Sequence, residues 1–392
     1  MTRHRIVRAE VFRVEVPLRY AYLSSRRLLR HYDKTIVRLT ADDGREGIGE
    51  TEAGDGVFAR AGDLARTLLR ADPLDRNRLR ALLRTVPDRH TRLEATGGTA
   101  AAGLEMACWD LAGKLLGVPL YELLGGAFRD EVPAVCELSA VPLQTSASDR
   151  EIAAFFDDVS NIGHVVRQAE RVVATHGYRY LKLKSRARDS AWDVAIMQAL
   201  HQALGPAVRL RLDPNAGYSP ADGLHLCREL DALGLQWFED PVAGLAEMSA
   251  LRRQIRTPLA TNMCVTDFPH LAPALQAAAV DVVGVDFFHW GGVANARDCA
   301  AACTALGFDL FGHCCFDLGV TSAANAHLAV ASPGMLNGVD TCLYLQEVDV
   351  IAGGPPTVRD GLLPYPGGPG LGVTLDAESL GRLTVDSVVL EA

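Results

Sequence analysis

Hydrophobic and polar positions alternate at the start of the chain. Residues 5–18, "RIVRAEVFRVEVPL", show the period of two that is typical of a half-buried strand. Residues 34–50, "KTIVRLTADDGREGIGE", read as two strands joined by a turn at Asp43-Gly44, which is a strong hairpin signal. Helical patterns follow at 58–69, 76–86 and 99–117. Strands followed by helices predict an α+β unit over residues 1–130.

After residue 131 the pattern changes to short apolar runs that end in polar residues and alternate with helical stretches. From position 184 onward the closing polar residues recur every 23 to 29 positions, which predicts a (β/α) barrel over residues 131–350. The loop-rich tail, 351–392, is expected to return to the N-terminal unit. The eight runs are "VPAVCEL" (132–138), "YLKLK" (180–184), "RLRLD" (209–213), "QWFED" (236–240), "PLATN" (258–262), "DVVGVD" (281–286), "FDLFGH" (308–313) and "GVD" (338–340).

Composition limits the classes of partner. The 392 residues are 48% hydrophobic and 22% charged, as in a globular protein with a large core. A net charge of −9 argues against nucleic acid and against an anionic membrane surface. No apolar run reaches about eighteen residues, so we expect no membrane span and no signal peptide. Nine scattered cysteines suggest free thiols in the cytoplasm. We expect a small-molecule ligand and a homo-oligomer.

Three hard-oxygen side chains close consecutive strands of the predicted barrel. Asp213, Glu239 and Asn262 would lie side by side at its mouth, where barrels of this kind place their chemistry. Carboxylate and amide oxygens favour Mg²⁺, or Mn²⁺, over zinc or copper. Taken singly, Asp213 could belong to a plain turn and Asn262 could be a strand cap. The register of all three favours a metal site.

Two groups could move protons on either side of this site. Lys182 and Lys184 lie two apart on one strand, so both ammonium groups face the same way. Their proximity to each other and to a cation is expected to lower their pKa values and to make Lys184 a base. The alternative is a solvated edge strand that carries lysines.

His313 follows the strand next to the one that Asp286 closes, so the carboxylate could orient the imidazole. The alternative is a core histidine with satisfied hydrogen bonds. With Lys184 on the opposite side, the arrangement predicts abstraction of the α-proton of a metal-bound carboxylate through an enediolate.

The chain resembles the enolase superfamily, in its mandelate racemase/muconate lactonizing enzyme-like branch. "ATNM" at 260–263 further resembles the glucarate dehydratase-like subgroup. The resemblance implies a (β/α)7β TIM-like barrel, an α+β capping domain formed by the N-terminal region and the tail, and Mg²⁺. It also implies dehydration of acid sugars by β-elimination. The motifs that carry it are K-x-K at 182–184, "DPNAGYS" with Asp213 and Asn215, "WFEDP" with Glu239, the Asp286 and His313 pair, "WDLAGKLLGVPLYELLGG" (109–126) and "PGGPGLGV" (366–373).

Several positions depart from glucarate dehydratases. Cys342 stands where they have His, Cys314-Cys315 where Ser and Asn are usual, and Glu137 where an aromatic residue is expected. The chemistry therefore carries over, but the glucarate substrate does not. Glu137 would repel a second carboxylate and favour a hydroxyl or ammonium group beside it.

A distinct loop at 18–34, "LRYAYLSSRRLLRHYDK", is placed over the barrel mouth by the resemblance. Arg26, Arg27 or Arg30 could clamp an anionic substrate from this loop, or the loop could be a solvated basic segment. We therefore name Asn215, Glu137, Arg27 and Arg30 as candidate substrate-binding residues.

Three functions remain open from the sequence. The first is a Mg²⁺-dependent dehydratase, a hydro-lyase acting on an acid sugar or a related hydroxy acid. The second is a racemase or epimerase of a hydroxy acid or an amino-acid derivative. The third is a catalytically inactive barrel that serves as a binding protein.

Overall fold

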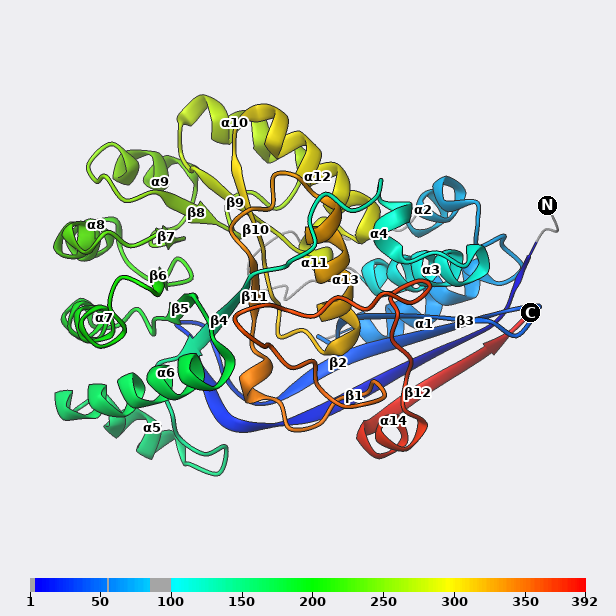
Figure 1. The fold of residues 1–392 in the computed structure, drawn as a ribbon, viewed down its shortest axis with the longest axis horizontal. Helices are drawn as coiled ribbons and strands as arrows, with labels where there is room; N and C mark the ends of the chain where they lie inside the picture. The colour runs from blue at the N-terminus through cyan, green and yellow to red at the C-terminus, as the bar shows by residue number, and fades with distance from the viewer. Residues whose placement is uncertain (1–3, 55, 85–99) are drawn as a thin grey trace.

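The computed structural model describes residues 4–54, 56–84 and 100–392. An antiparallel sheet in the order β12-β1-β2-β3 forms the cap, with β1 (Ile6–Leu23), β2 (Leu28–Ala41), β3 (Glu46–Glu52) and β12 (Thr384–Glu391). Helices α1 (Val57–Leu68), α2 (Arg76–Arg84) and α3 (Ala100–Leu116) accompany it, as Figure 1 shows. The end of the helix expected at 76–86 lies outside the described residues, as does the first residue of the one expected at 99–117.

Helix α3 crosses strand β3 at very close range. A β-carbon added to Gly49 would lie 1.9 Å from the carbonyl oxygen of Gly103, so the strand has no room for a side chain at this crossing. A second hydrophobic core fills the space between the cap sheet and α1, α2 and α3, separate from the larger core around the barrel.

The expected loop at 18–34 is mostly strand, so that prediction is wrong. Strand β1 continues to Leu23 and pairs with β2 up to Leu23↔Leu28, which leaves only residues 24–27 as the turn. The strand pairing shifts register between Pro17 and Tyr22, and Ala21 and Tyr22 are both buried, so the period of two that marks the first part of the strand is lost past Leu18. In Figure 1 the two long strands run from the cap sheet to the barrel beside β4.

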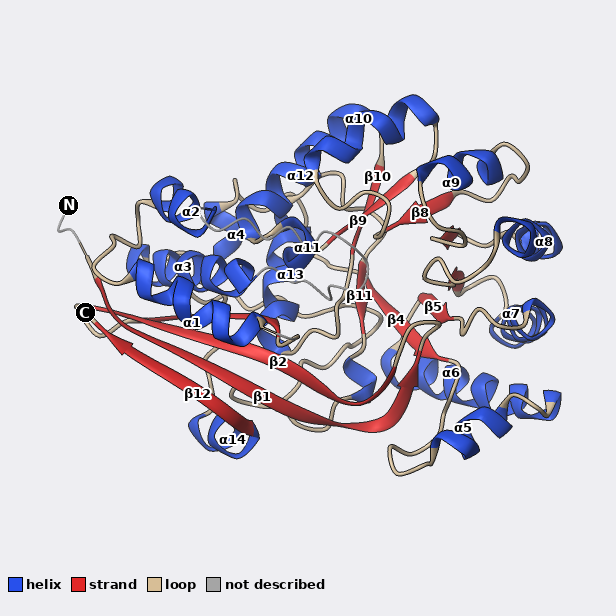
Figure 2. Ribbon diagram, turned by 180° about the vertical axis from the view of Figure 1, so that it is seen from behind, coloured by secondary structure: helices blue, strands red, loops and turns tan. Residues whose placement is uncertain are grey.

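Eight parallel strands close into a barrel, with an α-helical layer outside them (Figures 1 and 2). Each strand overlaps one of the eight runs expected from the sequence, with β4 and β11 each ending one residue beyond its run, so the predicted fold class is confirmed. The strands are β4 (Ala134–Ser139), β5 (Tyr180–Lys184), β6 (Arg209–Asp213), β7 (Trp237–Glu239), β8 (Leu259–Thr261), β9 (Val282–Val285), β10 (Asp309–Gly312) and β11 (Val339–Thr341).

Helices connect successive strands up to β11, which is followed by a short 3-10 turn (Leu343–Leu345) and the tail. This is the (β/α)7β arrangement. The connecting helices are α5 (Asp149–Phe155), α6 (Ile162–His176), α7 (Ser190–Leu204), α8 (Pro220–Leu230), α9 (Leu245–Arg252), α10 (Phe268–Ala277), α11 (Phe287–Trp290), α12 (Val293–Leu306) and α13 (Gly319–Ala331), with α4 (Leu120–Leu123) before β4 and α14 (Ala377–Leu383) in the tail.

The tail ends in β12, which pairs with β1 from Arg8↔Glu391 to Val14↔Thr384 and completes the cap sheet. The start of β1 and the end of β12 therefore lie at the same end of the molecule in Figure 1. The domain boundaries at residues 130 and 350 stay a prediction.

Within the described part of the chain, every helix is too short or too polar to cross a bilayer.

Candidate active site at the barrel mouth

Strand β5 places two buried ammonium groups among four carboxylates. Lys182 Nζ lies 2.6 Å from Asp340 Oδ2, 3.1 Å from Glu239 Oε1 and 3.1 Å from Glu137 Oε2. Lys184 Nζ lies 2.5 Å from Asp213 Oδ2. Both lysines are buried, so the alternative of a solvated edge strand is wrong. We call Lys182, Lys184, Glu137, Asp213, Glu239 and Asp340 the lysine cluster.

The carboxylates of the lysine cluster raise the pKa values of both lysines, which the sequence did not predict. Burial alone would lower the pKa of Lys184, but Asp213 and Glu137 outweigh it and raise that pKa, and carboxylates likewise raise the pKa of Lys182. The expectation of lowered lysine pKa values counted the neighbouring ammonium group and a bound cation but left out the surrounding carboxylates, which act in the opposite direction. Burial opposes ionisation of Glu137, but Lys184, Lys182 and Tyr22 lower its pKa to about 2.

Asn262 follows β8, and hydrogen bonds to neighbouring residues fix its position. Its backbone N–H donates to Asp240 Oδ2 at 2.8 Å, and the Thr261 hydroxyl donates to Asp240 Oδ1 at 2.6 Å. Its side-chain Nδ2 donates to His313 Nε2. Asn262 Oδ1 is buried and accepts no hydrogen bond from the described residues. An unpaired buried amide oxygen is costly, and a bound cation would satisfy it.

Asp213 is also fixed by its neighbours. Asn215 donates to it twice, from the backbone N–H to Oδ1 at 2.8 Å and from Nδ2 to Oδ2 at 3.1 Å. Asn215 adopts a left-handed φ of 50°, which turns its backbone N–H back toward the carboxylate. This candidate substrate-binding residue therefore orients a candidate metal ligand. The donor set of Asp213, Glu239 and Asn262 offers only oxygen atoms, which fits Mg²⁺ or Mn²⁺.

Asp286 brings two histidines together on the other side of the mouth. Its Oδ2 lies 3.0 Å from His313 Nδ1 and 2.6 Å from His289 Nδ1, and its Oδ1 accepts from the His289 backbone N–H at 2.7 Å. Cys315 Sγ lies 3.5 Å from His313 Nδ1. We call Asp286, His289, His313 and Cys315 the histidine cluster.

The histidine cluster gives its two imidazoles different affinities for protons. Burial lowers the pKa of His313, and Asp286 only partly opposes that shift. Burial also acts against protonation of His289, but Asp286 outweighs it and raises its pKa to about 9. The two histidines in turn hold the pKa of Asp286 well below its usual range, although burial opposes this. The sequence analysis named the Asp286 and His313 pair but missed His289, whose i+3 spacing from Asp286 on α11 was the available signal.

The three candidate arginines have separate partners. Arg26 Nε donates to the carbonyl oxygen of Asn215 at 3.2 Å, and the Arg27 guanidinium lies 4.8 Å from the centre of the Phe316 ring. Arg30 instead donates to the carbonyl of Thr145 and lies 2.8 Å from Asp149. The structure thus brings Arg26 and Arg27 to residues next to the two clusters and ties Arg30 to the start of α5.

Tyr22 reaches the lysine cluster from the cap and was not identified from the sequence. Its hydroxyl donates to Glu137 Oε1 at 2.5 Å, and its ring packs edge-on against Phe316 with centroids 4.8 Å apart. Cys342 Sγ lies 3.5 Å from the same Glu137 oxygen. Glu137 therefore has hydrogen-bond and ion-pair partners, whereas the sequence analysis treated it as an isolated negative charge.

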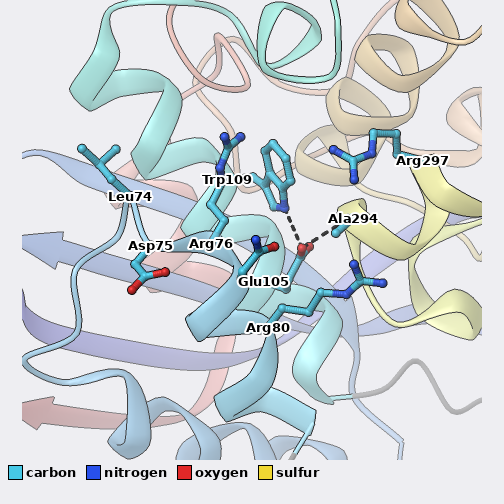
Figure 3. A pocket seen from close by; sticks show the side chains of 9 residues that line it. Leu74, Asp75, Arg76, Arg80, Glu105, Trp109, Ala294 and Arg297 are labelled. Carbon is cyan, nitrogen blue, oxygen red and sulfur yellow. Dashed lines mark hydrogen bonds between the residues drawn. The ribbon is translucent and has the colours of Figure 1, made fainter.

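A cavity of about 390 Å³ lies between the cap and the barrel, and none of the residues of the two clusters lines it (Figure 3). Glu105 on α3 accepts the Trp109 Nε1–H at 2.5 Å and the backbone N–H groups of Val293 and Ala294 at 2.6 and 3.2 Å. A carboxylate from the cap thus caps α12 of the barrel, because the first N–H groups of a helix lack partners within it. The lining residues are Leu74, Asp75, Arg76, Asn77, Arg80, Glu105, Trp109, Ala294 and Arg297.

Two family models match most of the chain. The mandelate racemase/muconate lactonizing enzyme N-terminal domain matches residues 6–125, and the enolase C-terminal domain-like model matches residues 164–379. The chain belongs to the enolase superfamily. The resemblance found in the sequence motifs is therefore confirmed.

Relatives in this superfamily differ in the reactions that their names describe. A probable glucarate dehydratase of Streptomyces coelicolor is 33% identical over 89% of this chain and 84% of its own length. An N-succinylamino acid racemase of Thermus thermophilus is 30% identical over 97% of this chain and 98% of its own length. The crystal structure of an enolase from Pseudomonas fluorescens with bound magnesium, potassium and tartrate aligns with a TM-score of 0.85 at 28% identity, covering 98% of this chain and 92% of that one.

Proposed function

We propose that this member of the enolase superfamily is a Mg²⁺-dependent hydro-lyase that removes the α-proton of a hydroxylated carboxylate, such as an acid sugar, and eliminates the β-hydroxyl group. The observation that carries the proposal is Asn262, which follows the strand paired with that of Glu239 and has an unpaired buried Oδ1, while its Nδ2 donates to His313. One residue thereby joins the candidate metal site to a candidate proton carrier. The Streptomyces coelicolor relative named a probable glucarate dehydratase supports this reaction class.

Asp213, Glu239 and Asn262 would hold the Mg²⁺ ion. When bound, the ion would stabilise the negative charge that develops on the substrate carboxylate as the α-proton leaves. Charge balance agrees with this role. The four carboxylates of the lysine cluster face Lys182, Lys184 and Arg211, which lies 3.1 Å from Asp340, so one net negative charge remains. A dication would leave one net positive charge, which favours an anionic substrate.

Lys184 and His313 are the groups that would move protons. With its Nδ1–H donating to Asp286, His313 presents the lone pair of Nε2 toward Asn262 and the mouth. Burial disfavours the imidazolium form, so Nε2 is available to accept a proton. In a dehydration one of the two groups removes the α-proton, and the other, in its protonated form, donates to the departing β-hydroxyl.

Racemisation or epimerisation is the second candidate. The lysines on β5 and His313 after β10 flank the three metal-ligand strands, so two proton carriers could serve opposite faces of one carbon. The Thermus thermophilus relative named an N-succinylamino acid racemase supports this reaction as the second candidate. The substrate decides between the two, because only a substrate with a β-hydroxyl can lose water.

A screen in D₂O distinguishes the candidates. The protein would be stripped with a chelator, reloaded with Mg²⁺ and incubated with acid sugars, hydroxy acids and N-acylamino acids, with products followed by NMR. We expect a 2-keto acid with little deuterium in the recovered substrate. Inverted substrate carrying α-deuterium, without keto acid, would replace the lyase by a racemase. Asn262→Leu serves as the control and should lose both the bound metal and the turnover.

We further propose that the enzyme acts in the cytoplasm as a homo-oligomer on a small-molecule carboxylate, without a nucleic-acid or membrane partner. Light scattering after size-exclusion chromatography tests the oligomeric state, and a monomer at micromolar concentration would contradict it.

A further inference from the structure

Four potential ligand atoms of the histidine cluster converge on one point. They are Asp286 Oδ2, His289 Nδ1, His313 Nδ1 and Cys315 Sγ, and all four lie within 4.8 Å of one another. Three of the side chains are buried, whereas His289 is 29% exposed and opens the cluster to solvent. This set is separate from the oxygen ligands Asp213, Glu239 and Asn262.

The spacing of these atoms is close to that of a tetrahedral metal site, although two of the separations are shorter. Zinc bonds of about 2.0–2.1 Å to nitrogen or oxygen and about 2.3 Å to sulfur place neighbouring ligand atoms roughly 3.3–3.7 Å apart. The observed separations from Asp286 Oδ2 are 2.6 Å to His289 Nδ1 and 3.0 Å to His313 Nδ1. Those from Cys315 Sγ are 3.5 Å to His313 Nδ1 and 3.9 Å to His289 Nδ1. The two separations from Asp286 are hydrogen-bond distances, and they would lengthen by about 0.3 to 0.7 Å around a bound metal.

The donor types select the metal. One thiolate and two imidazoles are the ligands of Zn²⁺ and of other late transition metals, whereas Mg²⁺ prefers oxygen. A carboxylate and a thiolate together balance the charge of a dication. The Cys315 thiol and the protonated His289 each give up a proton to solvent when they bind the metal. Lys34 Nζ donates to the Cys315 carbonyl oxygen at 2.6 Å and fixes the backbone that carries this thiol.

The geometry points to a second metal site in this enzyme, a Zn²⁺ site formed by Asp286, His289, His313 and Cys315. Its consequence for turnover rests on the proposed function. Zinc on Nδ1 of His313 places the imidazole proton on Nε2, and that nitrogen then donates instead of accepting. Zinc also takes the Asp286 carboxylate away from His313. Occupation of this site therefore switches off His313 as a proton acceptor. Because Asn262 Nδ2 donates to the same Nε2, it also forces that amide to turn or move away.

Cobalt substitution tests the site without any substrate. Co²⁺ would be added to chelator-stripped protein in the presence of excess Mg²⁺, and absorption would be recorded in the near ultraviolet. We expect a thiolate-to-cobalt charge-transfer band that Zn²⁺ abolishes at one equivalent. Cobalt in the oxygen-ligand site cannot give this band, because that site has no sulfur. Absence of the band in the unmodified protein would overturn the proposal.

Matched variants assign the ligands. Cys315→Ser should abolish the band, and His289→Ala should weaken Zn²⁺ binding by about 100-fold or more, since even outer-shell partners are worth 10- to 100-fold. Cys314→Ser is the control, because its sulfur accepts from the Asp317 N–H at 3.4 Å and lies outside the cluster. A band that survives Cys315→Ser, or that Cys314→Ser removes, would contradict the assignment. Partly exposed His289 keeps the test informative if Cys315→Ser fails to fold.

Inhibition is a separate readout. Once a substrate is known, half-inhibition by Zn²⁺ should require a higher Zn²⁺ concentration in His289→Ala than in the unmodified enzyme, each measured relative to its own turnover without Zn²⁺. Equal inhibition of both would refute the switch while leaving the spectroscopic site intact. If the screen yields no turnover at all, the proposed function fails and the cobalt result still stands on its own.

Discussion

The two sides of the barrel mouth hold their charged groups on different kinds of backbone. All six residues of the lysine cluster lie within strands β4, β5, β6, β7 and β11. The four residues of the histidine cluster follow strands β9 and β10 or lie on the short helix α11. Side chains on strands are held more precisely than side chains on loops. The lysine cluster therefore provides a fixed binding frame, and the histidine cluster can adjust.

The two sides also differ in how they compensate charge. The lysine cluster balances full charges at short range, and removing one member leaves another charge buried without a partner. The histidine cluster shares one carboxylate between two imidazoles whose protons can move. A fixed ionic frame beside an adjustable proton-carrying group is an arrangement suited to binding a carboxylate and then moving its α-proton.

Removing one proton carrier from each side should have the largest effect. Lys184→Ala and His313→Asn should each lower kcat by roughly 10²- to 10⁴-fold, the usual contribution of such a group. The double variant should be little worse than either single one, because groups that act in one pathway work as a unit. Single-turnover kinetics with the identified substrate measures this. If only one substitution matters, the other residue merely orients the substrate.

The next largest difference between the two clusters should be in how much one substitution lowers the free energy of unfolding. Asp340→Asn removes the partner of Lys182 and Arg211 and should cost about 3–5 kcal/mol, the usual penalty for breaking a buried ion pair. His289→Ala, on the partly exposed edge of the histidine cluster, should cost less than about 1 kcal/mol. Urea unfolding of both variants gives the comparison. Equal losses would show that the two sides are compensated alike.

The affinity for Mg²⁺ should also depend on Asp240, although this residue contacts none of the proposed ligand oxygen atoms. Asp240 holds the Asn262 backbone and the Thr261 hydroxyl, so Asp240→Asn should weaken Mg²⁺ binding by about 10- to 100-fold without unfolding the barrel. Titration calorimetry of the chelator-stripped protein measures the affinity. Unchanged binding would mean that Asn262 is not positioned through Asp240, or is not a ligand.

The smallest expected effect concerns the arginines near the hairpin turn. Arg27 lies over Phe316, whereas Arg30 is tied to Asp149, so Arg27→Ala should raise KM by up to roughly fivefold, about 1 kcal/mol, and Arg30→Ala should not. Steady-state kinetics of the pair tests this. An effect of Arg30→Ala equal to that of Arg27→Ala would indicate that Arg30 also contributes to an anion clamp over the substrate.

The barrel could be predicted because two sequence features mark each strand. One is its apolar run, and the other is the polar residue that closes the run. The same regular spacing identified Asp213, Glu239, Asn262, Asp286 and His313, although their roles stay predictions. Contacts between distant segments could not be predicted. Tyr22 meets Glu137 across 115 positions, and the direction of the lysine pKa shifts depends on carboxylates from four other strands.

The pairing of β12 with β1 has a consequence for how the protein is made. The outer edge of β1 has no strand beside it until β12, more than 350 residues downstream, is synthesised. During translation this long strand carries unpaired backbone groups that could join another nascent chain. Deleting residues 384–392 would make that transient exposure permanent, and it should favour aggregation of newly synthesised chains over a simple loss of activity.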